Sequence, residues 1–465
     1  MSDKHKMVFS FLILSFLFLI GRAVAQNDDA FLTLEDCIHI ALENNSDLKT
    51  TLYSDQAAKW DEVGSLKGIL PSISVSAGRG EVETGASEYL SNEPVGIDPE
   101  TGNVIYEQRT RTIAKSIRKS TSASVDVSQT IFDGGIWWNQ IRKAQVDKKV
   151  SDYTLASQRD YTILQVQQAY FDLIKQIKIL EVDSLAVDRS KAQLDRTQKM
   201  YELGATAQVD VFRAKVNLGN DRIQYLKQKN VVAQSRKNLN LVMGRDPFEP
   251  LQVEVEIPAV GTLPDVDELI ETALKKQPLI YKNQEELKSR KLSVALAKGI
   301  NYPRISAYIN YNRFHETPIK VFSDFDQNYQ TQYGVRMSFN LFNGFSDYVN
   351  IQKAEIGVRS AAEQYEAYKR NLKSTIHQYY ADYLSYLDII EINRLNLEAA
   401  REEYRLAKER YQVGAGTSLE VRESQVNLTK AEETLIVAQF NARFVLAQLD
   451  YNLGLSYAKY AGESE

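Results

Sequence analysis

Two long segments of the chain place apolar side chains at helical spacing, and we expect each to form one helix. Residues 136–203 contain no glycine or proline, and residues 345–413 contain only Gly357. Apolar positions step by four and three along both segments, which is typical of a coiled-coil seam. The first seam comprises Val166, Tyr170, Leu173, Ile177 and Leu180, and the second Ile376, Tyr380, Tyr383, Leu387 and Ile390. At 1.5 Å per residue each helix would reach roughly 100 Å, so we expect neighbours in a long bundle.

Each long helix is predicted to turn back on itself. Small residues interrupt both helices, at Gly204 and Ala205 in the first and at Gly414, Ala415 and Gly416 in the second. Helical spacing then resumes over residues 207–243 and 418–453. A break this short favours an antiparallel helix hairpin.

Four shorter segments alternate apolar and polar residues, and this period of two predicts strands. They lie near residues 71–80, 121–132, 303–313 and 331–342. Such a pattern fits either a half-buried sheet or a wall that faces lipid. The alternation alone leaves that choice open.

The two halves of the chain repeat one plan. YELGATAQVDVFRAKVNL begins at Tyr201, and the similar YQVGAGTSLEVRESQVNL begins 210 residues later at Tyr411. Short helical segments, LEDCIHIALENN and VDELIETALKKQ, open the halves. We expect a first repeat over residues 26–244, a proline-rich linker over 245–264, and a second repeat over 265–465 that ends in a short tail.

The repeats differ in length between Gly78 and Ser122, where the offset between matching residues falls from 232 to 210. This segment is rich in Gly, Ser, Thr and charge, so we expect an exposed loop that tolerates insertion. In the linker, LQVEVEI at residues 251–257 alternates as one short strand would.

The first 25 residues predict a signal peptide. Lys4 and Lys6 precede the apolar run MVFSFLILSFLFLI, and the small-residue pattern Ala23-Val24-Ala25 matches a cleavage site. The apolar run is shorter than the roughly 20 residues that span a bilayer, so a retained anchor is the minority interpretation. Cleavage would change the net charge from −5 to about −7. The single cysteine, Cys37, cannot form an intramolecular disulfide.

No pattern in the chain predicts catalysis. After cleavage only His39, His315 and His377 remain, and none lies beside a metal-ligand pattern. Neither a nucleophile motif nor a phosphate-binding glycine loop occurs. The pI of about 5.7 gives no strong attraction to nucleic acid. We expect a protein that is not an enzyme and that has no cofactor and no metal site.

The number of predicted strands constrains any membrane-embedded form. Nothing after the signal peptide approaches a transmembrane helix, so an exported chain that enters a membrane must do so as strands. Four strands cannot close a barrel, because the smallest known membrane barrels have about eight, and an open edge leaves backbone groups unpaired in lipid. Several copies must share one barrel. Three copies would supply about twelve strands and as many helical staves, enough to leave a lumen.

As a set, these features resemble the TolC-like outer-membrane efflux proteins, also called outer membrane factors. The resemblance rests on the predicted signal peptide, the paired short-helix segments, Pro71 and Pro303 before strands, IFDGG and LFNGF before long helices, and the Y-x-x-G tips at Tyr201 and Tyr411. It covers almost the whole mature chain. It implies a mainly α fold with a membrane part: a homotrimeric 12-stranded β-barrel in the outer membrane of a Gram-negative bacterium, continuous with a 12-helix periplasmic α-barrel.

The resemblance also implies a function and partners. Members of that family are passive exit ducts of tripartite efflux or type I secretion systems. The implied partners are two further copies of the chain, a periplasmic adaptor (membrane fusion) protein, an inner-membrane efflux or secretion transporter, and outer-membrane lipid. The cargo and the transporter class stay open. The alternative is a structural coiled-coil protein or surface adhesin without a lumen, and four alternating strands at repeat-equivalent places count against it.

Site residues follow from the resemblance at the helix tips. The tip turns and adaptor contacts would be formed by Tyr201, Gly204, Ala205, Tyr411, Gly414, Ala415 and Gly416. Acidic aperture positions of the family match Glu420 and Glu423, with Asp210 in the first repeat, and a ring of three carboxylates would favour cations. Thr417 to Glu420 also reads as a helix capping box, which is compatible with a ring. For Asp210, interaction with its helix N-terminus is an equal alternative.

Three further predictions concern the closing links and the strand-to-helix junctions. Some family members hold the tip closed with an arginine where this chain has Gly416, so we expect other links, such as Arg422 or Arg213. Trp137 and Trp138 fit an interfacial aromatic belt and ordinary burial equally well. Helix N-caps are predicted at the junctions, at Asp133 and Asn343.

Overall fold

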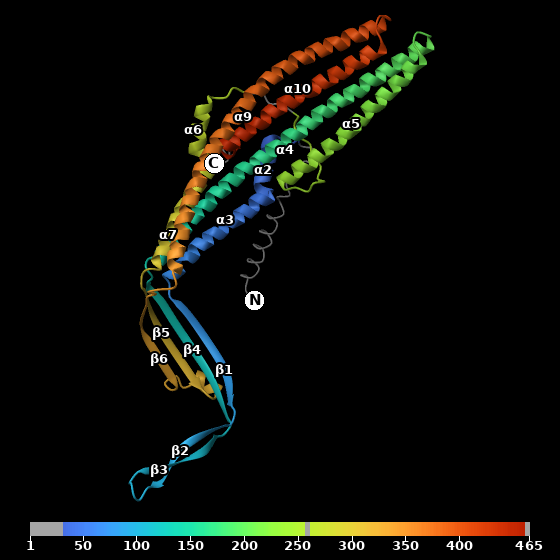
Figure 1. Cartoon of the computed structure of the whole chain (residues 1–465). Coiled ribbons are helices and arrows are strands. Elements are labelled where there is room, and N and C mark those ends of the chain that lie inside the picture. Colours follow the sequence, from blue (N-terminus) through green and yellow to red (C-terminus); the bar gives the residue numbers. More distant parts are fainter. Residues whose placement is uncertain (1–30, 256–260, 461–465) are drawn as a thin grey trace, which may run out of the picture. The chain divides into compact units, whose positions relative to one another are not determined.

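The computed structural model describes residues 31–255 and 261–460, which divide into two compact units (Figure 1). The first unit takes in residues up to 54, 152–282 and those from 366 onward, and the second takes in 55–151 and 283–365. The predicted signal peptide lies outside the described residues, as does the end of the predicted tail. Neither unit coincides with a repeat, so the repeat boundaries stay a prediction.

Four strands of the second unit form an antiparallel sheet in the order β1-β4-β5-β6. They are β1 Ser72–Thr84, β4 Ser116–Phe132, β5 Arg304–His315 and β6 Tyr329–Ser338. Each lies at a predicted strand position. Strand β6 ends at Ser338, four residues before its predicted end. Ser338 pairs with Arg304, the first residue of β5, so β5 offers no further residue for β6 to pair with.

The two faces of this sheet differ in polarity. Val75, Val125 and Tyr311 lie in register on one face. Asp126 and Asn310 pair on the other, where the Asn310 side-chain amide donates to Asp126 Oδ1 at 2.6 Å. The apolar face is open in the single chain, since Val75 is 74% exposed.

The loop that we predicted between Gly78 and Ser122 is instead ordered strand. Strands β1 and β4 stay paired as far as Thr84 and Ser116, and a separate hairpin follows, formed by β2 Ser87–Ile97 and β3 Val104–Ile113. Charged side chains replace apolar ones at many of its positions, as in the Arg111–Glu93 ion pair between the two strands. Alternation of apolar and polar residues is therefore weak here, although the backbone pairing is regular.

Helices make up the rest of the chain. The long ones are α4 Ile136–Glu202 and α9 Ser346–Gln412, which end within one residue of their predicted ends, and each contributes to both units. The return helices are α5 Gln208–Met243 and α10 Ser418–Leu453. The shorter helices are α2 Leu34–Asn44, α3 Ser46–Gly64, the 3-10 helix η1 Ser65–Gly68, α6 Val266–Lys276, α7 Pro278–Gly299, α8 Pro318–Phe322 and α11 Ser456–Tyr460.

The core of the first unit forms on the predicted seams. Val166, Tyr170 and Leu173 of α4 are buried against α2, α5 and Phe440 of α10. On α9, Tyr383 is fully buried against Ala438 and Ala442 of α10. Hydrogen bonds add to this packing, since Gln228 of α5 donates to the Gln176 carbonyl of α4 at 3.0 Å. Each long helix therefore packs beside its return helix, as Figure 1 shows for both hairpins.

The strand-to-helix junctions and the linker between the repeats test the predicted caps, tryptophans and short strand. Asp133 and Asn343 accept bonds from the backbone N–H groups of Trp137 (3.0 Å) and Asp347 (3.4 Å) in the first turns of α4 and α9. Both lie three residues before their helix begins, so they bond the first turn without occupying the predicted N-cap position. Trp137 is half-buried and lines a cavity of about 640 Å³, whereas Trp138 is 55% exposed. In the linker, the short strand reduces to one bridge between Leu32 and Val253 within the described residues.

Within the residues that the structure describes, no helix is both long and apolar enough to cross a membrane.

Candidate functional site

The tips of the two helix hairpins are built by the same turn. Gly204 and Gly414 have φ values of +76° and +75°, a left-handed conformation that glycine adopts without a Cβ clash. In each turn the residue after the glycine donates back across it: Ala205 to the Met200 carbonyl at 2.8 Å and Ala415 to the Arg410 carbonyl at 2.9 Å. These are the bonds of a Schellman-type helix end, so the glycines act as turn formers.

The tip tyrosines occupy different environments despite their equivalent positions. Tyr201 is 39% exposed, whereas Tyr411 is 5% exposed and its hydroxyl lies 3.5 Å from Thr197 Oγ1. The second tip therefore packs against α4, and the first tip does not pack in the same way. Gly416 is also constrained, because a Cβ there would lie 3.1 Å from the Tyr411 backbone nitrogen.

The three predicted aperture carboxylates behave differently. Glu420 donates its backbone N–H to Thr417 Oγ1 at 3.2 Å, which is one half of the predicted capping box. Its side chain instead points toward Arg410, 4.0 Å away. Glu423 is exposed. Asp210 accepts bonds from Thr206 (2.9 Å) and Ser418 (3.1 Å), so it joins the start of α5 to the start of α10.

A second link between the hairpins lies further from the tips. Arg422 of α10 binds Asp221 of α5 through two bonds, of 2.7 and 2.9 Å, and both side chains are largely buried. Gln425 donates to Ser190 Oγ at 2.8 Å and to the Ala186 carbonyl at 3.2 Å. Of the two arginines predicted to hold the tip closed, Arg422 therefore joins the two hairpins within one chain, and its part in closing the tip stays a prediction. Arg213 is 68% exposed at its side chain and reaches only Asp210, at 3.4 Å.

A third link, between Arg189 of α4 and Glu432 of α10, was not predicted. It is also doubly bonded, at 2.9 and 3.1 Å, and its side chains are 19% and 13% exposed. Asp221, Arg189 and Glu432 carry no motif and lie far apart in the sequence. No pattern in the sequence marked them as interhelical.

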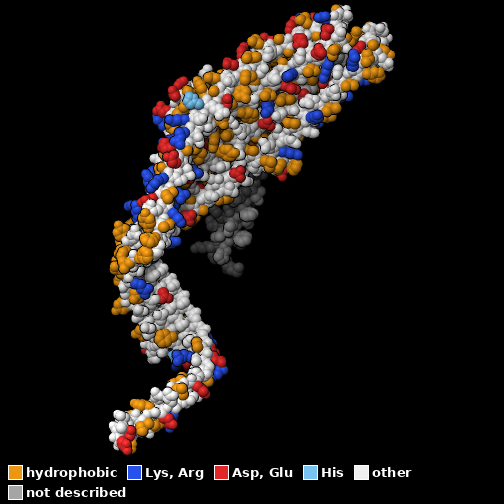
Figure 2. Space-filling view, in the orientation of Figure 1, with side chains coloured by type: hydrophobic (Ala, Val, Ile, Leu, Met, Phe, Trp, Pro, Cys, Tyr) orange, Lys and Arg blue, Asp and Glu red, His pale blue; other side chains and the backbone are white. Residues whose placement is uncertain are grey.

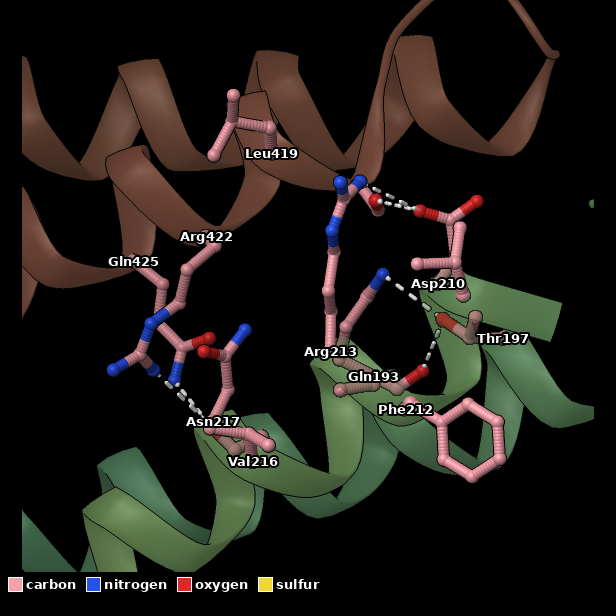
Figure 3. Close-up of a pocket in the computed structure, with 14 residues that line it drawn as sticks. Gln193, Thr197, Asp210, Phe212, Arg213, Val216, Asn217, Leu419, Arg422 and Gln425 are labelled. Atoms are coloured by element: carbon pink, nitrogen blue, oxygen red, sulfur yellow. Dashed lines mark hydrogen bonds and ion pairs between the residues drawn. The ribbon is translucent and has the colours of Figure 1, made fainter. Parts of the chain in front are cut away.

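Asp210 and Ser418 of the first link, and Arg422 and Gln425 of the second, line a cavity of about 520 Å³ between α4, α5 and α10 (Figure 3). Arg213 extends from α5 toward α10 across the cavity, while Arg422 and Gln425 approach from α10. Apolar side chains with large exposed fractions complete the wall: Val209, Phe212, Val216 and Leu419. Charged and apolar side chains therefore line the same cavity. No cluster of His, Cys, Asp or Glu that could hold a metal ion occurs in residues 31–255 and 261–460.

This combination of paired long helix hairpins and a small antiparallel sheet is the fold of outer-membrane efflux channels. A membrane protein from Pseudomonas aeruginosa matches with a TM-score of 0.74 at 18% identity, over 90% of this chain and 93% of that one. The outer membrane channel CmeC of Campylobacter jejuni matches with a TM-score of 0.72 at 18% identity, over 91% and 86%.

Sequence comparison identifies the family. Residues 37–245 and 269–455 match the family described as outer membrane efflux protein, and the chain belongs to it. The antibiotic efflux pump outer membrane protein ArpC of Pseudomonas putida is 23% identical over 287 residues, 59% of this chain and 56% of ArpC. The outer membrane protein TolC of Escherichia coli is 21% identical over 347 residues, 72% of this chain and 69% of TolC.

The alignment thus spans little more than half the length of the Pseudomonas putida relative. The resemblance, the mainly α fold with a β part and the outer-membrane location that we expected are confirmed. The family is one of channels rather than enzymes.

Proposed function

We propose that three copies of this chain form a passive exit duct that spans the outer membrane and extends through the periplasm. The duct would receive substrates from an inner-membrane transporter through a periplasmic adaptor. The printed names of the relatives, an antibiotic efflux pump protein and TolC, support this role. The chain itself would carry no catalytic step and need no cofactor.

The observation that carries the proposal is a pair of uncovered helix faces. Interhelical bonds join neighbours in the order α9-α10-α4-α5: Asn427 bonds Glu403, Arg189 bonds Glu432, and Gln228 bonds the α4 backbone. Nearer the tips α10 also bonds α5 directly, through Arg422 and Asp221. Helices α9 and α5 are therefore the two edges of the layer. Both edges carry large apolar side chains that no described residue covers, which is unusual for a surface that stays in water.

The two edges match each other in height. On α5, Ile223 and Leu226 are 53% and 58% exposed and lie 15 and 18 residues from the start of the helix at the tip. On α9, Leu395 and Ile392 are 58% and 56% exposed and lie 17 and 20 residues from its end at the tip. Placed side by side, α5 of one copy and α9 of the next would run antiparallel and join these residues in one apolar seam.

The sheet of the second unit supports the same assembly independently. Its edge strands β1 and β6 leave unpaired backbone groups, and its apolar face is exposed. Lipid suits such a face only when the edges are paired, which copies of the chain would do by joining β1 to β6. Three copies would give a closed barrel of about twelve strands.

A cross-linking experiment tests the seam. Leu226→Cys combined with Leu395→Cys should give disulfide-linked dimers and trimers when the purified full chain is oxidised in detergent. The native Cys37 is buried and should stay unreacted. As a matched control, Leu226→Cys with Val437→Cys places the second thiol on exposed α10 and should give none. Only monomers from the first pair would contradict the proposed assembly.

Roles at the tips follow from this assembly. Glu420 and Glu423 would form rings of three carboxylates at the periplasmic aperture, whereas Asp210 is already bonded to Thr206 and Ser418 and would join the hairpins. The cavity beside Arg213 and the tip turns would receive the adaptor. A coiled-coil adhesin without a lumen would not need the sheet.

A further inference from the structure

A small polar cavity of about 250 Å³ lies between α4, α5 and α10, further from the tips than the cavity of Figure 3. Four carboxylates and three cations meet in and beside it. The carboxylates are Asp183 of α4, Asp221 of α5, and Glu432 and Glu433 of α10; the cations are Arg189 of α4, and Arg422 and Lys430 of α10. Among these seven side chains the negative charges therefore outnumber the positive charges by one.

The two arginines are committed to two of the acids. Arg422 binds Asp221 and Arg189 binds Glu432, each through two hydrogen bonds. Lys430 is exposed and makes no ion pair with a described residue within 4.0 Å. Asp183 and Glu433 are thus the acids without an arginine.

Asp183 is the exceptional member of this group. It lines the cavity, is 2% exposed, and its Oδ2 atom has no hydrogen-bond partner among the described residues. A buried carboxylate oxygen without a partner is costly when charged, whereas a protonated carboxyl can donate a bond to a neighbouring acid.

We propose that Asp183 takes up a proton in the cavity that Glu433 also lines, and that binding this proton fastens α10 onto α4 and α5. Mild acid would then tighten the contact between the two helix hairpins. At neutral pH the charged acids would repel each other and Asp221 across the cavity. This repulsion would loosen the contact between the two hairpins.

The electrostatics of the cavity set the pH range. Burial, with the neighbouring charge of Asp221, raises the pKa of Asp183 from 3.8 to about 6. Burial, with the charges of Asp183 and Glu432, also raises the pKa of Glu433. A raised folded-state pKa means that the docked hairpins bind the proton more tightly than separated ones. Docking is therefore strengthened as pH falls through about 6, and the gain is complete below 3.8.

Hydrogen exchange of the purified full chain tests this directly. Amides of α10 in residues 421–436 should be about tenfold better protected at pH 5 than at pH 7.5, after correction for the intrinsic pH dependence of exchange. Asp183→Asn, which mimics the protonated acid, should remove the pH dependence. Asp188→Asn, an exposed aspartate on the same helix, should leave it unchanged.

Glu433→Gln provides a second variant. Loss of one neighbouring charge should lower the pH at which α10 protection changes. Equal protection of the wild-type protein at the two pH values would overturn the proposal, as would an unchanged pH dependence in Asp183→Asn.

The hydrogen-exchange result does not depend on the proposed duct. Conductance in planar bilayers therefore tests the duct separately from the proton site. We expect acid to lower the open probability of the wild-type channel and not that of Asp183→Asn. Absence of conductance at every pH, with the exchange result intact, would refute the duct and leave the proton site standing. Conductance without any pH-dependent exchange would refute the proton site and leave the duct standing.

Discussion

Removal of Arg422 should loosen the contact between the two helix hairpins far more than removal of the exposed Arg213 nearer the tips. Arg422 and Asp221 are joined by two short bonds, and their side chains are only 23% and 14% exposed. Loss of one partner from a fully buried pair costs about 3–5 kcal/mol, and we expect about 2 kcal/mol here because water still reaches the arginine. A loss of about 2 kcal/mol corresponds to roughly a 30-fold weaker contact.

Arg422→Met is the suitable change, because it keeps the apolar stem and removes the charge. The expected result is roughly 30-fold faster exchange of the α10 amides near residue 422, measured by hydrogen-exchange mass spectrometry. Arg213→Met is the matched control, since Arg213 is 68% exposed at its side chain and reaches Asp210 only at 3.4 Å. That variant should change exchange by less than about threefold.

A double-mutant cycle completes the test. Adding Asp221→Asn to Arg422→Met should recover part of the lost protection, because the double variant no longer buries a carboxylate without its opposite charge. Equal effects of Arg422→Met and Arg213→Met, or no recovery in the double variant, would refute the reasoning that burial makes this pair a strong link between the hairpins.

Three further predictions concern the aperture, the turns and the cysteine. Glu420→Gln with Glu423→Gln should lower cation preference in planar bilayers, and unchanged selectivity would remove both residues from the aperture. Gly244→Ala should lower the free energy of unfolding by about 3 kcal/mol in a thermal melt, because φ is +75° and the new Cβ would lie 2.4 Å from the Asn44 carbonyl oxygen. Gly204→Ala has the same φ but open space, so about 1 kcal/mol is expected, and equal losses would contradict the role of the clash. Burial raises the pKa of the Cys37 thiol to about 12, so it should resist maleimide at pH 7.5 until denaturant is added; fast labelling of the native protein would be the contrary result.

The long helices were predictable because the apolar spacing recurs along each helix and the whole helix occurs in both halves of the chain. Absence of glycine and proline, the four-three spacing, and the duplicated turns place α4 and α9 to within a residue of the observed ends. The hairpin β2-β3 was not predictable in the same way. Its strands pair through the backbone while charged residues such as Glu93 and Arg111 occupy positions that alternation would make apolar.

The links between the hairpins show a different limit of sequence analysis. Arg422 could be named because it follows the second tip closely. Its partner Asp221 lies 201 residues away and resembles any other acid on the exposed side of a helix. Only the packing of α10 against α5 brings the two together, and that packing depends on the whole layer of helices. The buried position of Asp183 follows from the same cause.

The central claim is that several copies of this chain pool their strands and helices to form one tube. Native mass spectrometry of the full chain, extracted from the outer membrane in detergent, tests it most directly. We predict an assembly with three times the mass of the processed chain. A species with the mass of one chain, stable without detergent, would contradict the account.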